Sequence, residues 1–304
     1  MNNIQIDNNK KILIIDTTTY MYRAFYALPS LTNNQGNPSG VIYGVINMLY
    51  KLLHKYNTYH IICVFDAPYK NFRHHLFKNY KKNRKSIPEN LKKQIPHLQQ
   101  IITFIGIPIF MIPFVEADDV IGTLSHKIAK QGYSVLISTN DKDMLQLITK
   151  KIKIIHTNNN NIIGISEVKK KYGISPIHII DLLSLMGDSA DNIPGVPKIG
   201  EKTALILLKH FQSLENIYNN IENIKHIPIH GANKIFNIIK TNKNIAFLSK
   251  KLATIKKDVL LNVNIKKNIN LPFQKKELIR LFHYYNFDIW KKKIENNAWL
   301  PTKT

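Results

Sequence analysis

The chain has 304 residues and a formal net charge of +23, from 43 lysines and arginines against 20 aspartates and glutamates. Its hydrophobic content of 44% suffices for one large core, or for a core and a satellite domain. No apolar run reaches the roughly 20 residues of a membrane span, the N-terminus MNNIQIDNNKK lacks a signal-peptide core, and one cysteine excludes a disulfide framework. These features predict a cytoplasmic protein with no membrane partner. The abundance of Ile, Asn and Lys is also what an AT-rich genome produces, so charge alone does not establish a nucleic-acid partner.

Four short apolar runs in the first 140 residues predict strands. Those at 10–16 and 60–66 end in aspartate, and those at 107–113 and 133–139 are followed by acidic residues. The alternation with helical patterns predicts a parallel α/β sheet that is covered on both faces, with ligands beyond the carboxyl ends of the strands. The helical patterns lie at about 39–56, 72–84, 88–105 and 117–131.

The pattern changes after residue 150. Residues 151–156 and 161–166 flank an asparagine tract and predict a β-hairpin at the edge of the sheet. We expect a linker at 268–272 and, at 275–293, a helical stretch whose apolar face packs on the body. Between the hairpin and the linker, helical patterns with short turns lie at 166–173, 176–186, 201–210, 213–220 and 231–253.

Nine acidic residues lie at strand ends or in one short Gly-Asp segment. A like-charged pair about 4 Å apart costs on the order of 4 kcal/mol at an effective dielectric of about 20, so a common pocket would require cations or protonation. A single aspartate after a strand is usually a helix N-cap or a turn residue. That explanation fails for the whole set, which we interpret as a metal site. Its members are Asp16, Asp66, Glu116, Asp118, Asp119, Asp141, Asp143, Asp188 and Asp191.

An all-carboxylate set predicts Mg²⁺ or Mn²⁺. The chain has no Cys-x-x-Cys pair, and adjacent His74 and His75 lack the spacing of a zinc site. Asp141-Lys-Asp143 is not followed by the glycine and distal glutamate of an EF-hand. Two such metals, about 3.5–4 Å apart, can stabilise the attacking and leaving oxygens of a phosphoryl displacement. The set therefore predicts phosphodiester hydrolysis.

The segment at 69–85 carries seven lysines and arginines interleaved with four aromatic residues. A solvated amphipathic helix with Phe72, Leu76 and Tyr80 on one face would explain this pattern. The alternative is a phosphate track with bases stacked on the aromatic rings. Its place directly after Asp66 favours the track.

Three of the four arginines lie within the first 84 residues, close in sequence to Asp16 and Asp66. This placement predicts bidentate contacts to phosphate groups. Lys81 and Arg84 could also stabilise charge that develops on the phosphate being cleaved. The three arginines are Arg23, Arg73 and Arg84.

Residues 195–203, GVPKIGEKT, nearly match a phosphate-binding P-loop. However, Glu201 separates Gly200 from Lys202, and no apolar strand precedes the segment, so we do not expect nucleotide binding. A hairpin between two helices, the second starting at about Glu201, can instead present backbone N–H groups to a DNA phosphate. Such contacts position DNA without reading its sequence.

Five segments resemble, in order, the motifs of the 5′-nuclease (flap endonuclease) superfamily, and above all the 5′→3′ exonuclease domain of bacterial DNA polymerase I. The resemblance runs from about residue 11 to at least residue 210. The segments are LIIDTTTYMYRAFYALP, VFDAPYKNFRHHLFKNYKKNR, EADDVIGTL, STNDKDMLQL and LMGDSADNIPGVPKIGEKTA.

The resemblance implies a PIN-like catalytic domain at 1–174 with a helical arch at about 68–95, and a helix-3-turn-helix DNA-binding domain at 175–304. It implies one metal held by Asp16, Asp66, Glu116 and Asp118. It implies a second metal held more loosely by Asp118 or Asp119 with Asp141, Asp143, Asp188 and Asp191. Arch residues near the scissile phosphate would be Tyr80, Lys81 and Arg84. The DNA-binding hairpin, which in this family also holds a monovalent cation such as K⁺ on backbone carbonyls, would include Gly195, Val196, Lys198, Gly200, Lys202 and Thr203.

Thr17 and Asn140 stand where the family usually has glycine, which affects local backbone geometry. The chain stops at residue 304 without room for a polymerase, so we expect a stand-alone nuclease, although a truncated polymerase would look alike. The resemblance implies a monomeric, nucleoid-associated Mg²⁺-dependent nuclease that removes 5′ flaps and RNA-primer ends in Okazaki-fragment maturation and repair. It would cooperate with a DNA polymerase and a ligase. A non-catalytic DNA-binding module and a PIN-type ribonuclease are the alternatives.

Overall fold

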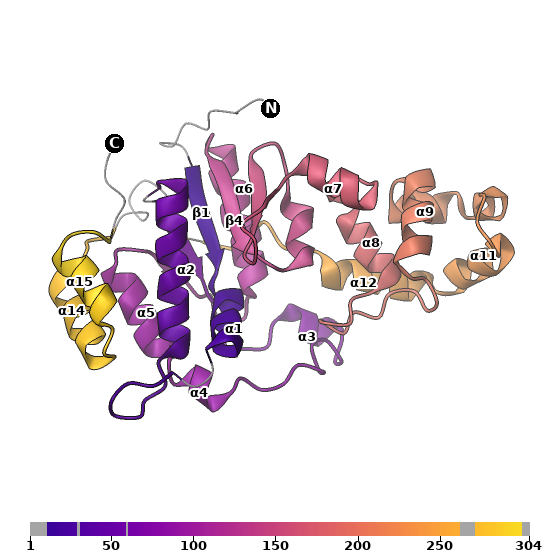
Figure 1. Ribbon diagram of the computed structural model, residues 1–304. Coiled ribbons are helices and arrows are strands. Elements are labelled where there is room, and N and C mark those ends of the chain that lie inside the picture. The colour runs from indigo at the N-terminus through magenta and orange to yellow at the C-terminus, as the bar shows by residue number, and fades with distance from the viewer. Residues whose placement is uncertain (1–10, 29–30, 59, 262–270, 300–304) are drawn as a thin grey trace.

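The computed structural model describes residues 11–28, 31–58, 60–261 and 271–299. At its centre lies a six-stranded sheet with the order β3-β2-β1-β4-β5-β6 (Figure 1). The first five strands are parallel, and β6 runs antiparallel to β5 at the edge, so the predicted sheet and edge hairpin are confirmed. The strands are β1 (Lys11–Asp16), β2 (Ile61–Val64), β3 (Ile109–Phe110), β4 (Ser134–Thr139), β5 (Ile152–His156) and β6 (Ile162–Ile163).

The central strand β1 is buried on both faces because successive side chains of a strand point to opposite sides. Ile12 and Ile14 belong to one apolar core, and Leu13 and Ile15 to the other. Full burial of each such side chain contributes about 1.5–3 kcal/mol. Helices cover the first core with α6 (Ala117–Lys130) and the second with α1 (Thr17–Ala27), α2 (Gly40–Tyr56) and α5 (Ile95–Phe104).

The elements at residues 165–253 form a helical lobe beside the sheet (Figure 1). Gly173, in the left-handed conformation, ends the first helix of the lobe, and the Ser213 side chain caps another by accepting a hydrogen bond from the N–H of Asn216. The apolar residues of the lobe continue the core on the α6 side of the sheet. The elements are α7 (Ile165–Tyr172), η3 (Pro176–His178), α8 (Ile179–Met186), α9 (Glu201–Phe211), α10 (Leu214–Asn219), η4 (Ile221–His226), α11 (Ala232–Thr241) and α12 (Lys243–Ala253).

The last two helices, α14 (Lys275–Tyr284) and α15 (Asp288–Glu295), return to the opposite side of the sheet from the lobe (Figure 1). Phe282 and Trp290 join the core beneath α2 and α5. Of the linker predicted at 268–272, only residues 271 and 272 lie within the described residues. None of the helices in the described ranges has the length and hydropathy that a membrane crossing requires.

The helix predicted at 72–84 is wrong beyond Leu76, where α3 (Phe72–Leu76) ends. Phe77 is extended, and Lys81 has a φ of 54°, in the left-handed region. The Lys81 N–H donates to the carbonyl of Asp191 at 2.9 Å. A partner distant in sequence therefore replaces the helical hydrogen bonds that the local pattern predicts.

Three further predicted helices are each divided in two. The stretch at 88–105 becomes α4 (Glu89–Lys92) and α5, because Pro96 favours a new helix start. In the stretch at 275–293, Asn286 has a φ of 57° and separates α14 from α15. The stretch at 231–253 divides at Asn242 into α11 and α12.

Candidate active site

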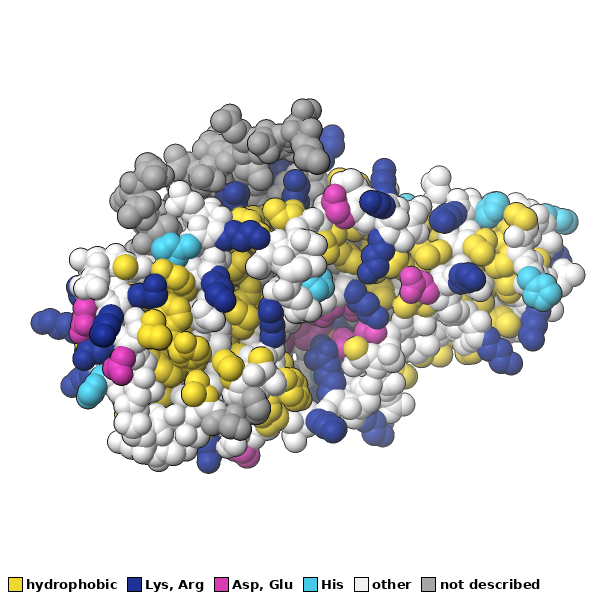
Figure 2. All heavy atoms as spheres, viewed as in Figure 1, with side chains coloured by type: hydrophobic (Ala, Val, Ile, Leu, Met, Phe, Trp, Pro, Cys, Tyr) yellow, Lys and Arg dark blue, Asp and Glu magenta, His cyan; other side chains and the backbone are white. Residues whose placement is uncertain are grey.

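Acidic side chains gather in a hollow between the sheet and the helical lobe, with Lys and Arg side chains at its edge (Figure 2). The carboxyl ends of β1, β2 and β4 meet here because parallel strands end on the same edge of a sheet. A pocket of about 330 Å³ opens there. Four of the predicted metal ligands line it: Asp16, Asp66, Asp118 and Asp141.

Backbone and hydroxyl donors fix two of these carboxylates. Asp16 caps α1 by accepting from the Thr19 N–H at 3.1 Å, and its other oxygen accepts from the Thr139 hydroxyl at 2.8 Å. Asp66 accepts from the Ala117 N–H at 2.9 Å, at the start of α6. Asp16 and Asp66 therefore accept structural hydrogen bonds, as aspartates after strands usually do, and still line the pocket.

A second group consists of Asp143, Asp188 and Asp191, which are all buried. Each offers one oxygen, and the three oxygens lie within 4.8 Å of one another. Asp143 belongs to η2 (Lys142–Leu147), which follows β4 directly after Asp141. Asp188 and Ile193 exchange backbone hydrogen bonds of 3.0 and 2.8 Å, which hold the turn that carries Asp188 and Asp191.

The electrostatics of both groups favour a bound cation. Burial, together with neighbouring carboxylates, raises the pKa of Asp118 and Asp143, and burial raises the pKa of Asp16 against opposing hydrogen bonds. Burial raises the pKa of Asp141 to about 6. One buried oxygen of Asp143 has no hydrogen-bond partner within the part of the chain that the structure describes. Carboxylate oxygens of this kind fit a hard divalent cation.

Three residues that follow α3 close over these carboxylates. The Lys81 ammonium lies 2.7 Å from Glu116 Oε1 and 3.5 Å from Asp191 Oδ2. The Tyr80 hydroxyl lies 3.1 Å from both Glu116 and Asp191, and Arg84 forms an ion pair with Asp191. Burial opposes the charged form of Lys81, but Glu116 and Asp191 outweigh it and raise the Lys81 pKa. These cations therefore balance part of the acidic charge.

The arginine expected to contact phosphate at position 73 is instead a buried structural residue, which corrects that prediction. Arg73 is 2% exposed and forms ion pairs with Asp119 at 2.7 Å and Glu116 at 2.8 Å. Asp119 is fully buried in this pairing and does not line the pocket. Of the alternatives Asp118 and Asp119, the geometry favours Asp118 as the metal ligand.

The other predicted DNA contacts divide into two sets. Arg23 lines the pocket, where it also donates to the carbonyl of Thr157. Gly195 and Val196 are buried, and their N–H groups donate inward, to the Ser249 hydroxyl and the Leu185 carbonyl. These two N–H groups are therefore engaged within the protein, and a contact of Gly195 or Val196 with DNA stays a prediction. Lys198, Gly200 and Lys202 are exposed, and Thr203 is half-buried at the start of α9.

Sequence reasoning missed several residues of the site, including Lys142 and Tyr22. Lys142 lies 2.7 Å from Asp188 Oδ1, and its position between the predicted ligands Asp141 and Asp143 is a signal that could have found it. Tyr22 lines the carboxylate pocket one helical turn beyond Thr18 and Thr19, which line it too. The spacing of these α1 residues becomes informative only once α1 is known to start at the site.

An apolar pocket of about 260 Å³ adjoins the carboxylate pocket and shares Thr18, Tyr22, Asp66, Lys81 and Arg84 with it. Its wall includes Leu91, Ile95 and Met111. At its rim, Tyr69 is 52% exposed, and its ring lies 4.8 Å from that of Phe114, which is 64% exposed. Exposed aromatic rings next to basic side chains suit unpaired bases.

The family model of the 5′-3′ exonuclease N-terminal resolvase-like domain matches residues 11–173, and that of the 5′-3′ exonuclease C-terminal SAM fold matches residues 174–277. A 5′-3′ exonuclease of Buchnera aphidicola subsp. Baizongia pistaciae is 52% identical over 96% of this chain and 97% of its own length. The DNA polymerase I of Pseudomonas aeruginosa is 43% identical over 92% of this chain but only 31% of its own length.

Among solved structures, this fold is similar to that of the bacteriophage T5 flap endonuclease in a pseudo-enzyme–product complex with DNA and metal ions. The TM-score is 0.64, at 19% identity, over 94% of this chain and 97% of that one. This similarity confirms the expected two-part fold, a nuclease-type sheet followed by a helical lobe.

Proposed function

The chain belongs to the 5′-3′ exonuclease family, and from that premise we propose that it hydrolyses DNA phosphodiesters as a Mg²⁺-dependent 5′→3′ exonuclease and 5′-flap endonuclease. The observation that carries this proposal is the pocket of Asp16, Asp66, Asp118 and Asp141, joined by the trio of Asp143, Asp188 and Asp191. Basic residues line the same pocket, and a phosphate could enter it between them and the carboxylates.

The carboxylates fit divalent cations, and we propose Mg²⁺ or Mn²⁺ at two positions. Asp16, Asp66, Glu116 and Asp118 would hold one cation, and Asp141, Asp143, Asp188 and Asp191 the other. When bound, such cations supply positive charge that stabilises the oxygens of a phosphoryl group during displacement.

Lys81 and Arg84 act on the phosphate in this proposal, and Tyr80 positions the carboxylates beneath them. Lys81 and Arg84 line the pocket while forming ion pairs with Glu116 and Asp191. A phosphate that enters the pocket competes with these carboxylates for the two cations, and contacts that strengthen in the transition state accelerate the reaction. The Tyr80 hydroxyl holds Glu116 and Asp191 in place at the base of this segment.

Duplex DNA would lie against the hairpin at 195–203 and the start of α9. Lys198 and Lys202 are exposed there, and no side chain of the described residues caps the N-terminus of α9, so its first N–H groups could donate to a phosphate. We also propose K⁺ at the backbone carbonyls of residues 195–200. The unpaired 5′ strand would pass the rim of the apolar pocket at Tyr69 and Phe114.

In the cell, we propose that the protein removes 5′ flaps and RNA-primer ends during Okazaki-fragment maturation and repair. It would act as a monomer in the cytoplasm at the nucleoid, before a DNA polymerase and a ligase complete the strand. The relationship to DNA polymerase I supports this role. We assign catalysis to residues 1–174 and duplex binding to residues 175–304, within which α14 and α15 pack on the catalytic part.

The test is cleavage-site mapping on a labelled double-flap DNA, with Mg²⁺ and with EDTA. We expect Asp118→Ala to lower the cleavage rate at least about a hundredfold, because it removes a ligand of the cation proposed to stabilise transition-state charge. Asp258→Ala, at an exposed aspartate outside the pocket, should cleave like wild type.

Equal rates for Asp118→Ala and wild type would contradict the mechanism. If the protein binds the flap DNA but does not cleave it with any metal, the alternative of a DNA-binding module is supported. If it cleaves a hairpin RNA in preference to the flap DNA, the alternative of a ribonuclease is supported.

A further inference from the structure

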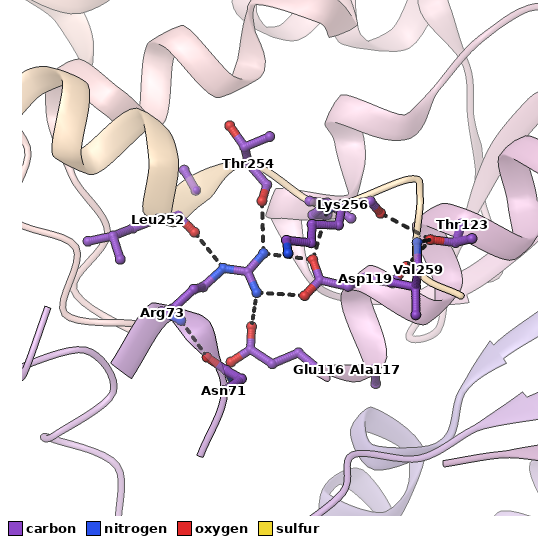
Figure 3. A network of polar contacts seen from close by, with 12 residues as sticks. Asn71, Arg73, Glu116, Ala117, Asp119, Thr123, Leu252, Thr254, Lys256 and Val259 are labelled. Carbon is purple, nitrogen blue, oxygen red and sulfur yellow. Dashed lines mark hydrogen bonds and ion pairs between the residues drawn. The ribbon is translucent and has the colours of Figure 1, made fainter. Parts of the chain in front are cut away.

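An extended segment at 254–259, here called the strap, follows α12 and lies along α6 (Figure 3). Gln146 holds it by donating to the Ala253 carbonyl at 2.9 Å and accepting from the Ile255 N–H at 3.0 Å. The Lys256 N–H donates to Asp119 at 2.8 Å. A Cβ at Gly122 would lie 2.6 Å from the Ile255 side chain, so the close approach of the strap to α6 requires this glycine.

Arg73 joins the strap to the candidate active site. Its Nε donates to the Leu252 carbonyl and one Nη to the Thr254 carbonyl, both at 2.8 Å, and the remaining N–H groups bind Asp119 and Glu116 (Figure 3). All five guanidinium N–H groups are therefore used, in a fixed planar arrangement that lysine cannot reproduce.

Glu116 is the point at which this network meets the site. Arg73 binds Glu116 Oε2 at 2.8 Å, while Lys81 binds Oε1 at 2.7 Å. A displacement of the Leu252 and Thr254 carbonyls would move Arg73, which holds Glu116. Movement of Glu116 would in turn shift its ion pair with Lys81 beside the pocket.

The other end of the connection is the hairpin proposed to contact duplex DNA. On α12, the buried Ser249 hydroxyl accepts a hydrogen bond of 3.0 Å from the Gly195 N–H. Ser249 and Leu252 are three positions apart, so they lie on the same face of the helix. One helix therefore contacts the hairpin and, one turn later, Arg73.

We propose that α12 couples the hairpin to the active site, with Ser249 and Arg73 as positioning residues that set Glu116 and Lys81 when duplex DNA binds. This inference rests on the proposed function. Ser249 and Arg73 touch neither the phosphate nor a metal in this proposal. Contacts between duplex DNA and the lobe should therefore raise kcat, and not only the affinity for DNA.

The experiment compares kcat and KM on two substrates, a 5′-flap DNA with a long duplex and a single-stranded oligonucleotide of the same sequence. The variants are Arg73→Lys, Ser249→Ala and their combination. Ser184→Ala is the matched control, because Ser184 is also fully buried, but it donates within α8, to the Ile180 carbonyl. Melting temperatures are recorded for every variant.

We expect the ratio of kcat on flap DNA to kcat on the oligonucleotide to fall about tenfold in Ser249→Ala and in Arg73→Lys, within the usual range of coupling between sites. KM should stay within about twofold, and the double variant should fall no further than the lower single variant, because both act in one connection. Ser184→Ala should keep the wild-type ratio.

An unchanged ratio in Ser249→Ala, or the same ratio in Ser184→Ala and Ser249→Ala, would overturn the inference. If Arg73→Lys does not fold, Ser249→Ala against Ser184→Ala decides alone. Failure of wild type to cleave either substrate would refute the proposed function instead, so the two failures are distinguishable.

Discussion

Asp143 illustrates at one residue the electrostatic cost of the site. It is buried, one of its oxygens has no partner among the described residues, and burial together with Asp141 and Asp188 raises its pKa. A carboxyl whose pKa is raised by folding lowers the stability of the folded state at pH values above that pKa. The cost disappears as the pH falls towards the ordinary aspartate pKa of about 3.9.

Asp143→Asn should therefore stabilise the protein in EDTA at pH 8, by about 1.4 kcal/mol for each unit by which the pKa is raised. The gain over wild type should shrink as the pH is lowered to about 5, because the wild-type carboxyl then takes up a proton itself. The measurement is urea unfolding of both proteins across this pH range.

Mg²⁺ provides the complementary measurement. It should raise the melting temperature of wild type more at pH 8 than at pH 5, since binding requires deprotonated ligands, and it should raise that of Asp143→Asn less. Asp258→Asn, at an exposed position, should match wild type in both series. A lower stability of Asp143→Asn in EDTA at pH 8 would contradict this account.

Lys81 is expected to serve catalysis more than binding. Lys81→Met should lower the cleavage rate by about a hundredfold to a thousandfold, as for loss of one donor to transition-state charge, while the Kd for flap DNA measured in EDTA changes only severalfold. Lys82→Met, at the exposed neighbouring position, is the control and should retain most of the rate. A loss confined to Kd would assign Lys81 to DNA binding alone.

Single residues differ in how far their roles follow from sequence. Asp16 and Asp66 were predictable because each ends an apolar run, and a parallel sheet brings such ends together. Arg73 was not, because its partners include the carbonyls of Leu252 and Thr254, which no local pattern connects to it. A basic residue beside a predicted site is therefore ambiguous until its surroundings are known.

At the scale of elements, the strands were predictable and the segment at 77–84 was not. The apolar runs are short and bounded, and those of β1, β2 and β4 are largely buried, which suffices to predict parallel strands. The segment after α3 instead takes its shape from tertiary contacts, including the Lys81 N–H with Asp191 and the Asn83 side chain with Ser189. Helical spacing of its apolar residues was overridden by these bonds.

Gly187 begins the turn at 187–195, and its backbone conformation gives a testable prediction. Gly187 has φ 75° and ψ −179°, a conformation open almost only to glycine, and a Cβ there would lie 2.6 Å from the Ile193 carbonyl oxygen. Gly187→Ala should cost about 2 kcal/mol or more in urea unfolding. It should also weaken Mg²⁺ binding, because it displaces Asp188 and Asp191.

Gly132→Ala is the control for this turn. Gly132 also has a positive φ, of 99°, but a Cβ there would meet nothing within 4 Å. Gly132→Ala should lower the free energy of unfolding by about 1–2 kcal/mol and leave Mg²⁺ binding unchanged. Equal effects of the two variants on Mg²⁺ binding would show that the turn does not position the carboxylates.

Across the whole molecule, a net charge of +23 coexists with an acidic pocket. A net positive charge attracts DNA in general, so the salt dependence of binding separates specific phosphate contacts from this general attraction. Lys202→Ala should reduce the magnitude of the slope of log K against log salt by about 0.9, the value of one lost phosphate contact.

Flap-DNA binding in EDTA at several salt concentrations gives this slope. Lys276→Ala, at an exposed lysine of α14 on the far side of the sheet, should leave it unchanged. The same reduction in both variants would mean that the hairpin makes no special contact.

The return of α14 and α15 to the sheet has a consequence for how the protein is made. Leu13 and Ile15, near the beginning of the chain, share a core with Phe282, Trp290 and Trp299. A ribosome delivers these partners after residues 165–253, so a nascent chain exposes part of the α2 and α5 surface until residue 299 has emerged. Packing of the core on this side of the sheet is therefore completed only after synthesis of the helical lobe.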